Sequence, residues 1–250
     1  AKKMSSKPIL EVEKLNVRYQ TKDGEIHAVE DVSFKVFSNE VFGIAGESGC
    51  GKSTLIKAIM RLLPENGKMD ANSINYKDLK IDRMSDNIFR NEVLWTQISL
   101  VPQSAMNSLN PVYKVGEQIV EAIQAHTSQG KKEARERVEE LFDVVGLQSE
   151  FMDSFPHEFS GGMRQRAMIA MALALDPGLI IMDEPTTGLD VLVQEKILRR
   201  IREIRKQIRS SIILITHDIA VIAEMSDRIA VMYGGHIMEQ AKSIDLFESP

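Results

Sequence analysis

The chain contains 250 residues, 43% of them hydrophobic, and its formal net charge at pH 7 is −5. This length allows a substantial core, and the acidic balance argues against a general nucleic-acid binder. One cysteine, Cys50, excludes an internal disulfide and a cysteine metal cluster, and it fits the cytosol. The longest apolar run, residues 167–175, is too short to span a bilayer, and the first residues do not resemble a signal peptide.

Two strands are expected at the start of the chain. Residues 9–19 alternate between apolar and polar side chains, and residues 25–36 continue as strand after an Asp23-Gly24 turn. Together they predict an antiparallel sheet over approximately residues 1–40.

A glycine-rich loop follows, with a strand before it and a helix after it. Residues 41–45 form a short apolar run typical of a buried strand, and residues 53–63 have the apolar spacing of a helix that Pro64 ends. The loop between them fits the pattern G-x-x-x-x-G-K-[ST]. Its residues are Gly46, Glu47, Ser48, Gly49, Cys50, Gly51, Lys52 and Ser53, and Thr54 comes next.

This pattern predicts a site for the phosphates of a nucleotide. Its glycines let successive backbone N–H groups point toward phosphate oxygens, and the start of the helix adds a positive field. Lys52 would reach the β- and γ-phosphates, and the hydroxyl of Ser53 would ligate Mg²⁺. Chance produces the pattern in roughly one chain of this length in a hundred, and the strand and helix around the loop weaken that explanation further.

The middle of the chain changes from loops to helices. Residues 66–91 predict loops with short elements, and residues 98–103 predict a strand. Helical patterns cover residues 115–123 and 131–145, and Gly146 suits a helix end. Two successive helices without a strand between them indicate a helical subdomain inserted into an α/β core. A third helix is expected over residues 163–175, with Ser160 as its N-cap.

Two acidic residues end the next predicted strand. Residues 179–182 are apolar, as in a parallel strand buried on both faces, and Asp183 and Glu184 stand at its carboxyl end. Asp183 could hold Mg²⁺, directly or through water, while Glu184 could polarise an attacking water. The alternative is that both acids are caps or surface groups, but the phosphate loop earlier in the chain favours a metal site.

The last third of the chain completes the core. Asp190 is expected to cap a long helix over residues 191–209, whose many basic side chains indicate a solvated face more readily than a binding patch. The other predicted elements are a strand over residues 211–216 with His217 at its tip, a hairpin over residues 229–233 and 235–240, and a helical turn over residues 243–248.

In this order the motifs resemble those of ABC-type ATPases, the nucleotide-binding subunits of ATP-binding-cassette transporters. A lone Gln or His match is weak, but the ordered set covers essentially the whole chain. The matching positions are Gly46 to Thr54 for the phosphate loop, Gln103 for the Q-loop, Phe159 to Met163 for the signature, Leu179 to Glu184 for Walker B, Gly188 to Asp190 for the D-loop and His217 for the switch histidine.

The resemblance implies a single ABC ATPase domain over residues 1–250, with an α/β fold. Its P-loop NTPase core, a mainly parallel RecA-like sheet flanked by helices, would use residues 41–103 and 176–250. The N-terminal antiparallel β subdomain would occupy approximately residues 1–40, and the α-helical subdomain with the signature would occupy residues 104–175. ATP and Mg²⁺ are the implied cofactors, and ATP hydrolysis is the implied reaction.

The resemblance also assigns roles around the nucleotide. Tyr19 corresponds to the aromatic residue that stacks on adenine, although an aromatic side chain packed at a strand end is the alternative. Gln103 would contact Mg²⁺ or the attacking water, and His217 would contact the γ-phosphate. The implied catalytic set is Glu184, His217, Lys52 and Gln103, and the implied metal set is Ser53, Gln103 and Asp183.

The signature departs from the commonest LSGGQ form, with Phe159 for Leu and Met163 for Gln. Ser160, Gly161 and Gly162 remain, and a hydroxyl with backbone N–H groups at a helix start is again an anion site. By resemblance this site faces the γ-phosphate of ATP that a second ATPase subunit holds. The active unit would be a head-to-tail homo- or heterodimer, with Asp190 linking its two half-sites.

A narrower resemblance concerns the transported solute. Residues 102–112 and 156–166 are similar to the ATPases of di- and oligopeptide importers, a group that includes nickel and some sugar uptake systems. This implies a peripheral protein on the cytoplasmic face of the cell membrane. Its partners would be transmembrane permease subunits and, indirectly, an external solute-binding protein, with no nucleic acid.

Three other functions stay open at this point. An exporter ATPase would usually be fused to membrane helices. A DNA-repair ATPase would usually have a long coiled coil between phosphate loop and signature, where this chain has about a hundred residues, and a translation ATPase usually has two cassettes. A non-catalytic binding module is disfavoured because Lys52, Asp183, Glu184 and His217 are intact.

Overall fold

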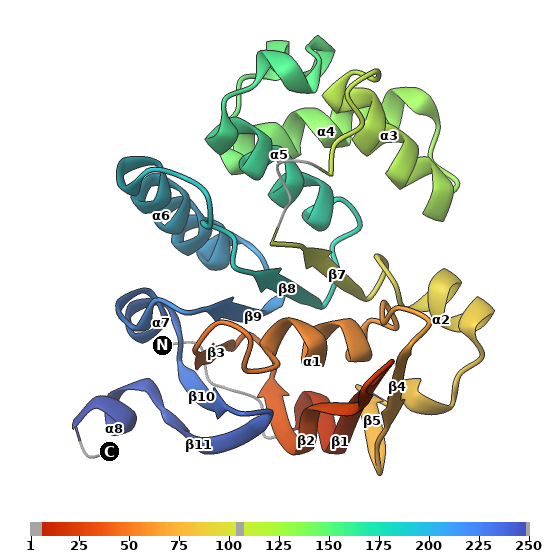
Figure 1. The fold of residues 1–250 in the computed structure, drawn as a ribbon. Coiled ribbons are helices and arrows are strands. Elements are labelled where there is room, and N and C mark those ends of the chain that lie inside the picture. The colour runs from red at the N-terminus through yellow and green to blue at the C-terminus, as the bar shows by residue number, and fades with distance from the viewer. Residues whose placement is uncertain (1–6, 104–107, 249–250) are drawn as a thin grey trace. The chain divides into compact units, whose positions relative to one another are not determined.

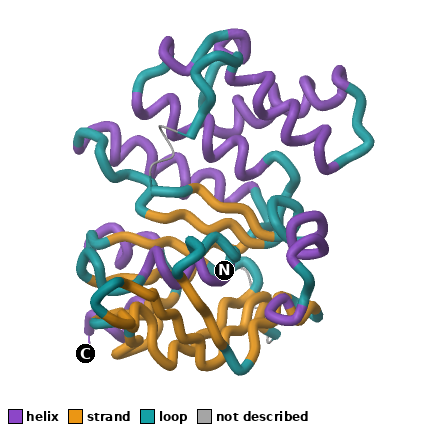
Figure 2. The backbone as a smooth tube through the Cα atoms, turned by 45° about the vertical axis from the view of Figure 1, so that its right-hand side comes forward, coloured by secondary structure: helices purple, strands orange, loops and turns teal. Residues whose placement is uncertain are grey.

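The structure is a computed structural model that describes residues 7–103 and 108–248. The chain divides into two compact units. The first combines Ala1–Arg90 with Ser211–Pro250, and the second is Asn91–Ser210. Strands predominate in the first unit and helices in the second (Figure 2).

The first unit begins with an antiparallel sheet of strand order β2-β1-β5-β6 (Figure 1). The predicted strands are present as β1 (Pro8–Thr21) and β2 (Gly24–Phe37). β1 also pairs with β4 (Gly67–Asp70) and β5 (Ser73–Tyr76), and β5 pairs with β6 (Leu79–Lys80). The sheet therefore extends beyond residue 40, because the segment expected to be mainly loops contributes its short strands to it.

A second group of strands in this unit carries the phosphate loop. β3 (Val41–Gly46) pairs in parallel with β9 (Ser211–Thr216) and with β10 (Arg228–Tyr233), and β11 (His236–Lys242) is antiparallel to β10. All six residues of β9 are buried, as expected for a strand covered on both faces. Because Ala45 pairs with Thr216, the carboxyl ends of β3 and β9 bring Gly46 and His217 to one edge.

Four described helices lie wholly or partly in the first unit. They are α1 (Lys52–Ile59), α2 (Asp86–Glu92), which begins in the first unit and follows a 3₁₀ turn at Ile81–Arg83, α7 (Ile219–Met225) and α8 (Ser243–Glu248). Helix α7 was not predicted from the sequence. Its N-cap is Asp218, whose carboxylate accepts the N–H groups of Ala220 and Val221 at 2.9 and 3.1 Å.

The predicted helix over residues 53–63 is wrong at its end, because α1 stops at Ile59. Arg61 takes a left-handed conformation, with φ 55°. The N–H groups of Arg61 and Leu62 turn back to the carbonyls of Ala58 and Lys57 at 3.1 and 2.7 Å. These two bonds form a Schellman motif, which closes the helix before Pro64 can act.

The second unit combines one parallel strand pair with a helical region. β7 (Ile98–Val101) pairs with β8 (Leu179–Asp183). The helices are α3 (Val115–His126), α4 (Lys131–Val145), α5 (Gly161–Leu173) and α6 (Val191–Gln207), with 3₁₀ turns at Ser149–Asp153 and Pro156–Glu158. Thus three helices separate the two strands in sequence, as expected for a helical insertion.

Helix α4 shows why its apolar spacing predicted a helix correctly. Its apolar stripe is fully buried: Ala134, Val138, Leu141, Phe142 and Val145. Burying a Leu or Phe side chain stabilises a fold by about 1.5–3 kcal/mol, and Gly146 ends the helix with φ 70°.

No helix within the described residues has the length and apolar character needed to cross a bilayer. Residues 104–107, part of the segment that resembles peptide-importer ATPases, lie outside the described residues.

Candidate functional site

The phosphate loop takes a shape that requires glycine at two positions. Gly46 has φ 155°, and a Cβ there would lie 2.3 Å from the carbonyl oxygen of Met232. Gly51 has φ 106°, and a Cβ there would lie 2.4 Å from the carbonyl oxygen of Ala28. Because the obstacles are backbone atoms, they have little freedom to move away.

Lys52 lies inside this loop and is 4% exposed. Its Nζ donates hydrogen bonds of 2.7 Å to the carbonyls of Gly46 and Glu47, and lies 3.7 Å from Sγ of Cys50. The loop therefore wraps around the ammonium group. Glu47, Ser48 and Gly49 are exposed at its tip, Cys50 is buried, and Ser53 and Thr54 are half-buried at the start of α1.

The loop is braced by the turn between β10 and β11. The N–H of Gly235 donates to the carbonyl of Cys50 at 3.0 Å, and the N–H of Glu30 donates to the carbonyl of Gly235 at 2.9 Å. Sequence reasoning missed Gly235, Met232 and Ala28. All three act through backbone atoms from distant segments, so their residue types gave little signal.

Tyr19 lies beside the start of α1. Its hydroxyl donates to Oγ1 of Thr54 at 3.4 Å, and a Cβ at Gly67 would lie 3.0 Å from its ring. The ring is therefore packed against β4 at the end of β1 and also near the loop, so the geometry is compatible with both interpretations of Tyr19.

His217 is exposed at the end of β9. Together with Gly46 and Glu47 it lines a largely apolar cavity of about 310 Å³ in the first unit. The structure thus brings the predicted switch histidine next to the beginning of the phosphate loop.

The two predicted Walker-B acids are buried in the second unit. Asp183 is 6% exposed and Glu184 is 9% exposed. Glu184 has φ 47°, a left-handed conformation that is uncommon for a side chain of this size. Such strain persists only where surrounding contacts hold it.

Two donors orient the Glu184 carboxylate. Nε2 of Gln103 and Oγ1 of Thr187 donate to its Oε2 at 3.0 and 2.8 Å. The structure therefore brings the predicted Q-loop residue and the predicted base together, and it adds Thr187, which sequence reasoning missed. The amide nitrogen of Gln103 is therefore the atom that faces Glu184.

The signature turn and the start of α6 lie together in the same unit. Oγ of Ser160 accepts the N–H of Met163 at 3.2 Å, which confirms the predicted N-cap. A Cβ at Gly162 would lie 2.6 Å from Cγ1 of Val193. Oδ1 of Asp190 accepts the N–H of that same Val193 at 3.0 Å, so Asp190 caps α6 as predicted.

One of the two unusual signature residues, Phe159, has a packing role. Phe159 is 3% exposed and meets Phe151 edge to face, with ring centroids 5.7 Å apart. Met163 and Gly161 are half-buried, and Ser160 is exposed. A large apolar residue at position 159 therefore suits this chain.

The predicted metal residues are all hard oxygen donors. A hydroxyl, a carboxylate and an amide oxygen suit Mg²⁺, which usually takes few protein ligands and completes its shell with phosphate oxygens and water. The described residues contain no cluster of three or more His, Cys, Asp or Glu side chains suited to a metal. Ser53 belongs to the first unit, and Gln103 and Asp183 belong to the second; each supplies an oxygen donor of the kind that Mg²⁺ prefers.

Known protein families match this chain. A family model described as "ABC transporter" matches residues 29–187. A shorter model, described as "AAA domain, putative AbiEii toxin, Type IV TA system", matches residues 153–223.

Curated relatives match nearly the whole chain. The dipeptide transport ATP-binding protein DppD of Bacillus subtilis is 43% identical over 97% of this chain and 73% of its own length. The oligopeptide transport ATP-binding protein OppD of Salmonella typhimurium is also 43% identical, over 97% of this chain and 72% of its own length.

Solved structures share the fold. One, described as a dimeric post-hydrolysis state of an ATP-binding cassette bound to ADP and Pi, has a TM-score of 0.82 at 26% identity, covering 94% of this chain and 98% of that one. Another, cbiO1 from Clostridium perfringens, described as part of the ABC transporter complex cbiONQ, has a TM-score of 0.82 at 29% identity, covering 97% of this chain and 91% of that one.

Proposed function

Because this chain belongs to the ABC transporter family, we propose that it hydrolyses ATP to drive the import of dipeptides or oligopeptides. The observation that carries the solute class is its 43% identity, across 97% of its length, to a dipeptide transport ATP-binding protein. The buried Glu184 carboxylate, oriented by Gln103 and Thr187, supports the hydrolytic part.

In this proposal ATP lies with its phosphates along the loop from Gly46 to Ser53. The Lys52 ammonium and the loop N–H groups balance the phosphate charge, and Tyr19 stacks on the adenine. Glu184 orients the attacking water and accepts its proton. His217 contacts the γ-phosphate from the end of β9.

The chain's oxygen donors would hold the cation. Ser53, Asp183 and the Gln103 amide oxygen would hold Mg²⁺, which when bound neutralises charge that develops on the phosphates.

The second half of the proposal is a dimer. Ser160, Gly161 and Gly162 would face the γ-phosphate bound by a second ATPase subunit, and Asp190 would connect the two half-sites. A structural neighbour is described as dimeric and bound to ADP and Pi, which supports this arrangement. Closing and reopening of the dimer would drive permease subunits at the cytoplasmic face of the cell membrane, and an external binding protein would deliver the peptide.

Growth and uptake measurements test the solute class. A strain that lacks this gene should fail to use a dipeptide as the source of a required amino acid, and the wild-type chain should restore growth. A Lys52→Ala chain, which loses phosphate contacts, should be made at normal levels but fail to restore it. Undiminished uptake of both a dipeptide and an oligopeptide by the deletion strain, with its other peptide importers removed, would exclude peptide import as the role of this chain.

A further inference from the structure

A strongly basic cavity adjoins the signature turn within the second unit. It has a volume of about 390 Å³, and α5 and α6 supply most of its lining. Four cationic side chains line it, namely Arg166, Lys196, Arg199 and Arg200, against a single carboxylate, that of Glu203.

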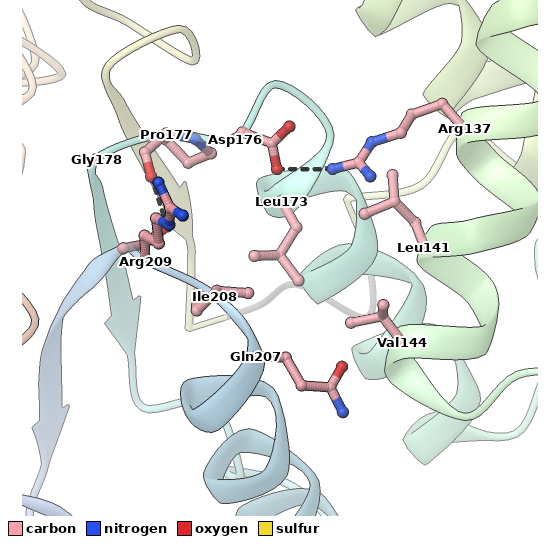
Figure 3. A pocket seen from close by; sticks show the side chains of 11 residues that line it. Arg137, Leu141, Val144, Leu173, Asp176, Pro177, Gly178, Gln207, Ile208 and Arg209 are labelled. Atoms are coloured by element: carbon pink, nitrogen blue, oxygen red, sulfur yellow. Dashed lines mark hydrogen bonds and ion pairs between the residues drawn. The ribbon is translucent and has the colours of Figure 1, made fainter. Parts of the chain in front are cut away.

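A second cavity of the same unit provides the comparison. Its volume is about 410 Å³, and its lining includes Leu141, Val144 and Leu173. The charge of Arg137 at this cavity is met by Asp176 at 2.7 Å (Figure 3). Arg209 also lines this second cavity, so it has two cationic side chains to one carboxylate, whereas the cavity beside the signature turn has four to one.

Two of the four cations are held firmly in place. Nη1 of Arg166 donates to the carbonyl of Gly146 at 2.5 Å, and Nη2 of Arg200 donates to the carbonyl of Asp143 at 2.6 Å. Both carbonyls belong to the end of α4, where the helix dipole favours cations. A Cβ at Gly146 would lie 3.1 Å from Nη2 of Arg200, so the guanidinium rests on the helix end.

These contacts leave positive charge uncompensated. Glu203 accepts from Nη1 of Arg200 at 2.7 Å, but the buried Nε–H of Arg200 has no acceptor among the described residues. Lys196 and Arg199 form no ion pair within the part of the chain that the structure describes. Burial, together with the charge of Arg200, lowers the pKa of the Arg166 guanidinium, which is the sign of a cationic group short of counter-charge.

Capping of the end of α4 explains why Arg166 and Arg200 line the cavity. It does not explain the presence of the exposed Lys196 and Arg199. Guanidinium and ammonium groups that converge on one cavity suit a tetrahedral oxyanion. Ser160 and Gly162, which line the same cavity, belong to the signature turn. The cavity therefore borders the place where, under the proposed function, hydrolysis separates the γ-phosphate.

We propose that this cavity is a binding site for inorganic phosphate, separate from the phosphate loop, which receives the phosphate product beside the signature turn. The identification of the phosphate as a reaction product rests on the proposed function. The presence of the site does not, because the binding can be measured without nucleotide.

The test is a calorimetric titration of nucleotide-free protein with inorganic phosphate at constant ionic strength. The wild type should bind phosphate saturably at millimolar concentrations, and a Lys196→Gln/Arg199→Gln double variant should bind about tenfold more weakly or not at all. Both side chains are exposed, so the fold should persist. A Lys131→Gln/Lys132→Gln variant removes two exposed positive charges outside the cavity and should bind like the wild type.

A Lys52→Ala variant separates this site from the phosphate loop. It should lose nucleotide binding but keep phosphate binding, whereas loss of both would place the phosphate in the loop and overturn the proposal. Unchanged binding by the Lys196→Gln/Arg199→Gln variant, or no saturable binding by the wild type, would overturn it as well. Complete displacement of the phosphate by ADP in the Lys52→Ala variant would show that the cavity takes a nucleotide phosphate instead.

Discussion

The side-chain amide of Gln103 donates a hydrogen bond of 3.0 Å to the carboxylate of Glu184. Gln103 follows β7 and Glu184 follows β8, and these strands pair in parallel. The bond therefore connects the predicted Q-loop residue with the group expected to activate water. A displacement of Gln103 would therefore change the orientation of the Glu184 carboxylate.

Replacing Glu184 with Gln should leave ATP binding in place and lower kcat by about 10²–10⁴-fold, since a neutral amide cannot accept the water's proton. Replacing Gln103 with Ala should lower kcat by a smaller factor, about tenfold, because the base remains but loses the hydrogen bond from Gln103. Steady-state hydrolysis and nucleotide binding, measured side by side, check both. Turnover close to wild type in the Glu184→Gln protein would reject the general-base role.

Replacing Ser160 with Ala should abolish most hydrolysis while leaving the affinity of the monomer for ATP unchanged, because the hydroxyl is expected to contact nucleotide on another subunit. Loss of the N-cap should also cost about 1 kcal/mol of stability. A Ser160→Thr protein keeps the hydroxyl and should retain activity. Weakened binding of ATP by monomeric Ser160→Ala protein would place the serine in its own subunit's site.

Two glycines of the phosphate loop should respond differently to alanine. At Gly46 the new Cβ would collide with the Met232 carbonyl, so we expect a loss of about 2–3 kcal/mol in unfolding free energy together with lost nucleotide binding. Gly49 also has positive φ, at 82°, but open space around it, so Gly49→Ala should cost only about 1 kcal/mol. Urea denaturation of the two proteins measures the difference. Equal losses would mean that backbone strain, rather than the close approach, decides the residue type at Gly46.

Arg61 combines a strained backbone with an anchored side chain. Its guanidinium donates to the carbonyls of Ile81 and Met84 at 2.5 and 2.8 Å, pairs with Asp86 at 2.7 Å and lies over the ring of Phe89. Arg61→Ala should therefore destabilise the protein by about 2–4 kcal/mol. Arg61→Gly should be milder by about 1 kcal/mol because glycine suits φ 55°. Thermal and urea unfolding check the order, and the reverse order would show that the helix end is not strained.

Glu40 should make stability depend on pH. It is fully buried, and burial raises its pKa above the ordinary 4.5, against the opposing effects of the Phe37 N–H and Arg228. A raised carboxyl pKa means that the folded state holds the proton more tightly, so this contribution is complete below pH 4.5 and is lost as pH rises through the raised pKa. The difference in unfolding free energy between the wild type and the Glu40→Gln protein should therefore fall as the pH rises from 4.5 to the raised pKa of Glu40. Urea titrations at several pH values measure it, and a constant difference would contradict the raised pKa.

Elements with a strong periodic pattern and a clear stop were predictable. Helix α4 was placed residue for residue, because its apolar stripe is regular and Gly146 marks its end. The end of α1 was not, because a left-handed Arg61 replaces the glycine that usually signals such a turn, and the contacts that hold it come from residues 81–89. The short α7 carried a signal that was overlooked, an Asp218 N-cap directly before an apolar segment.

The candidate site also combines features that the sequence predicted with features that it did not. The loop motif and the strand pattern indicated the phosphate loop and the two acids, and the family resemblance indicated the signature turn, because those chemistries depend on side chains in a fixed order. The contact of Thr187 with Glu184 depends on the left-handed turn at Glu184, and the approach of the Ala28 and Met232 carbonyls to the loop depends on how distant segments fold together, so no sequence pattern indicated either. The catalytic, adenine-binding and metal-binding roles of the individual residues stay predictions.

The close contact between Gly162 and Val193 ties the start of α5 to the start of α6. The N–H of Val193 is also the one that Asp190 caps, so the signature turn and the start of α6 are packed together through one residue. Ser160 and Asp190 would then form one preorganised surface for a second subunit. That subunit would dock without rearranging the two helix starts. Dimer formation would then cost less conformational entropy, so a modest binding energy from ATP could be enough to hold two copies together.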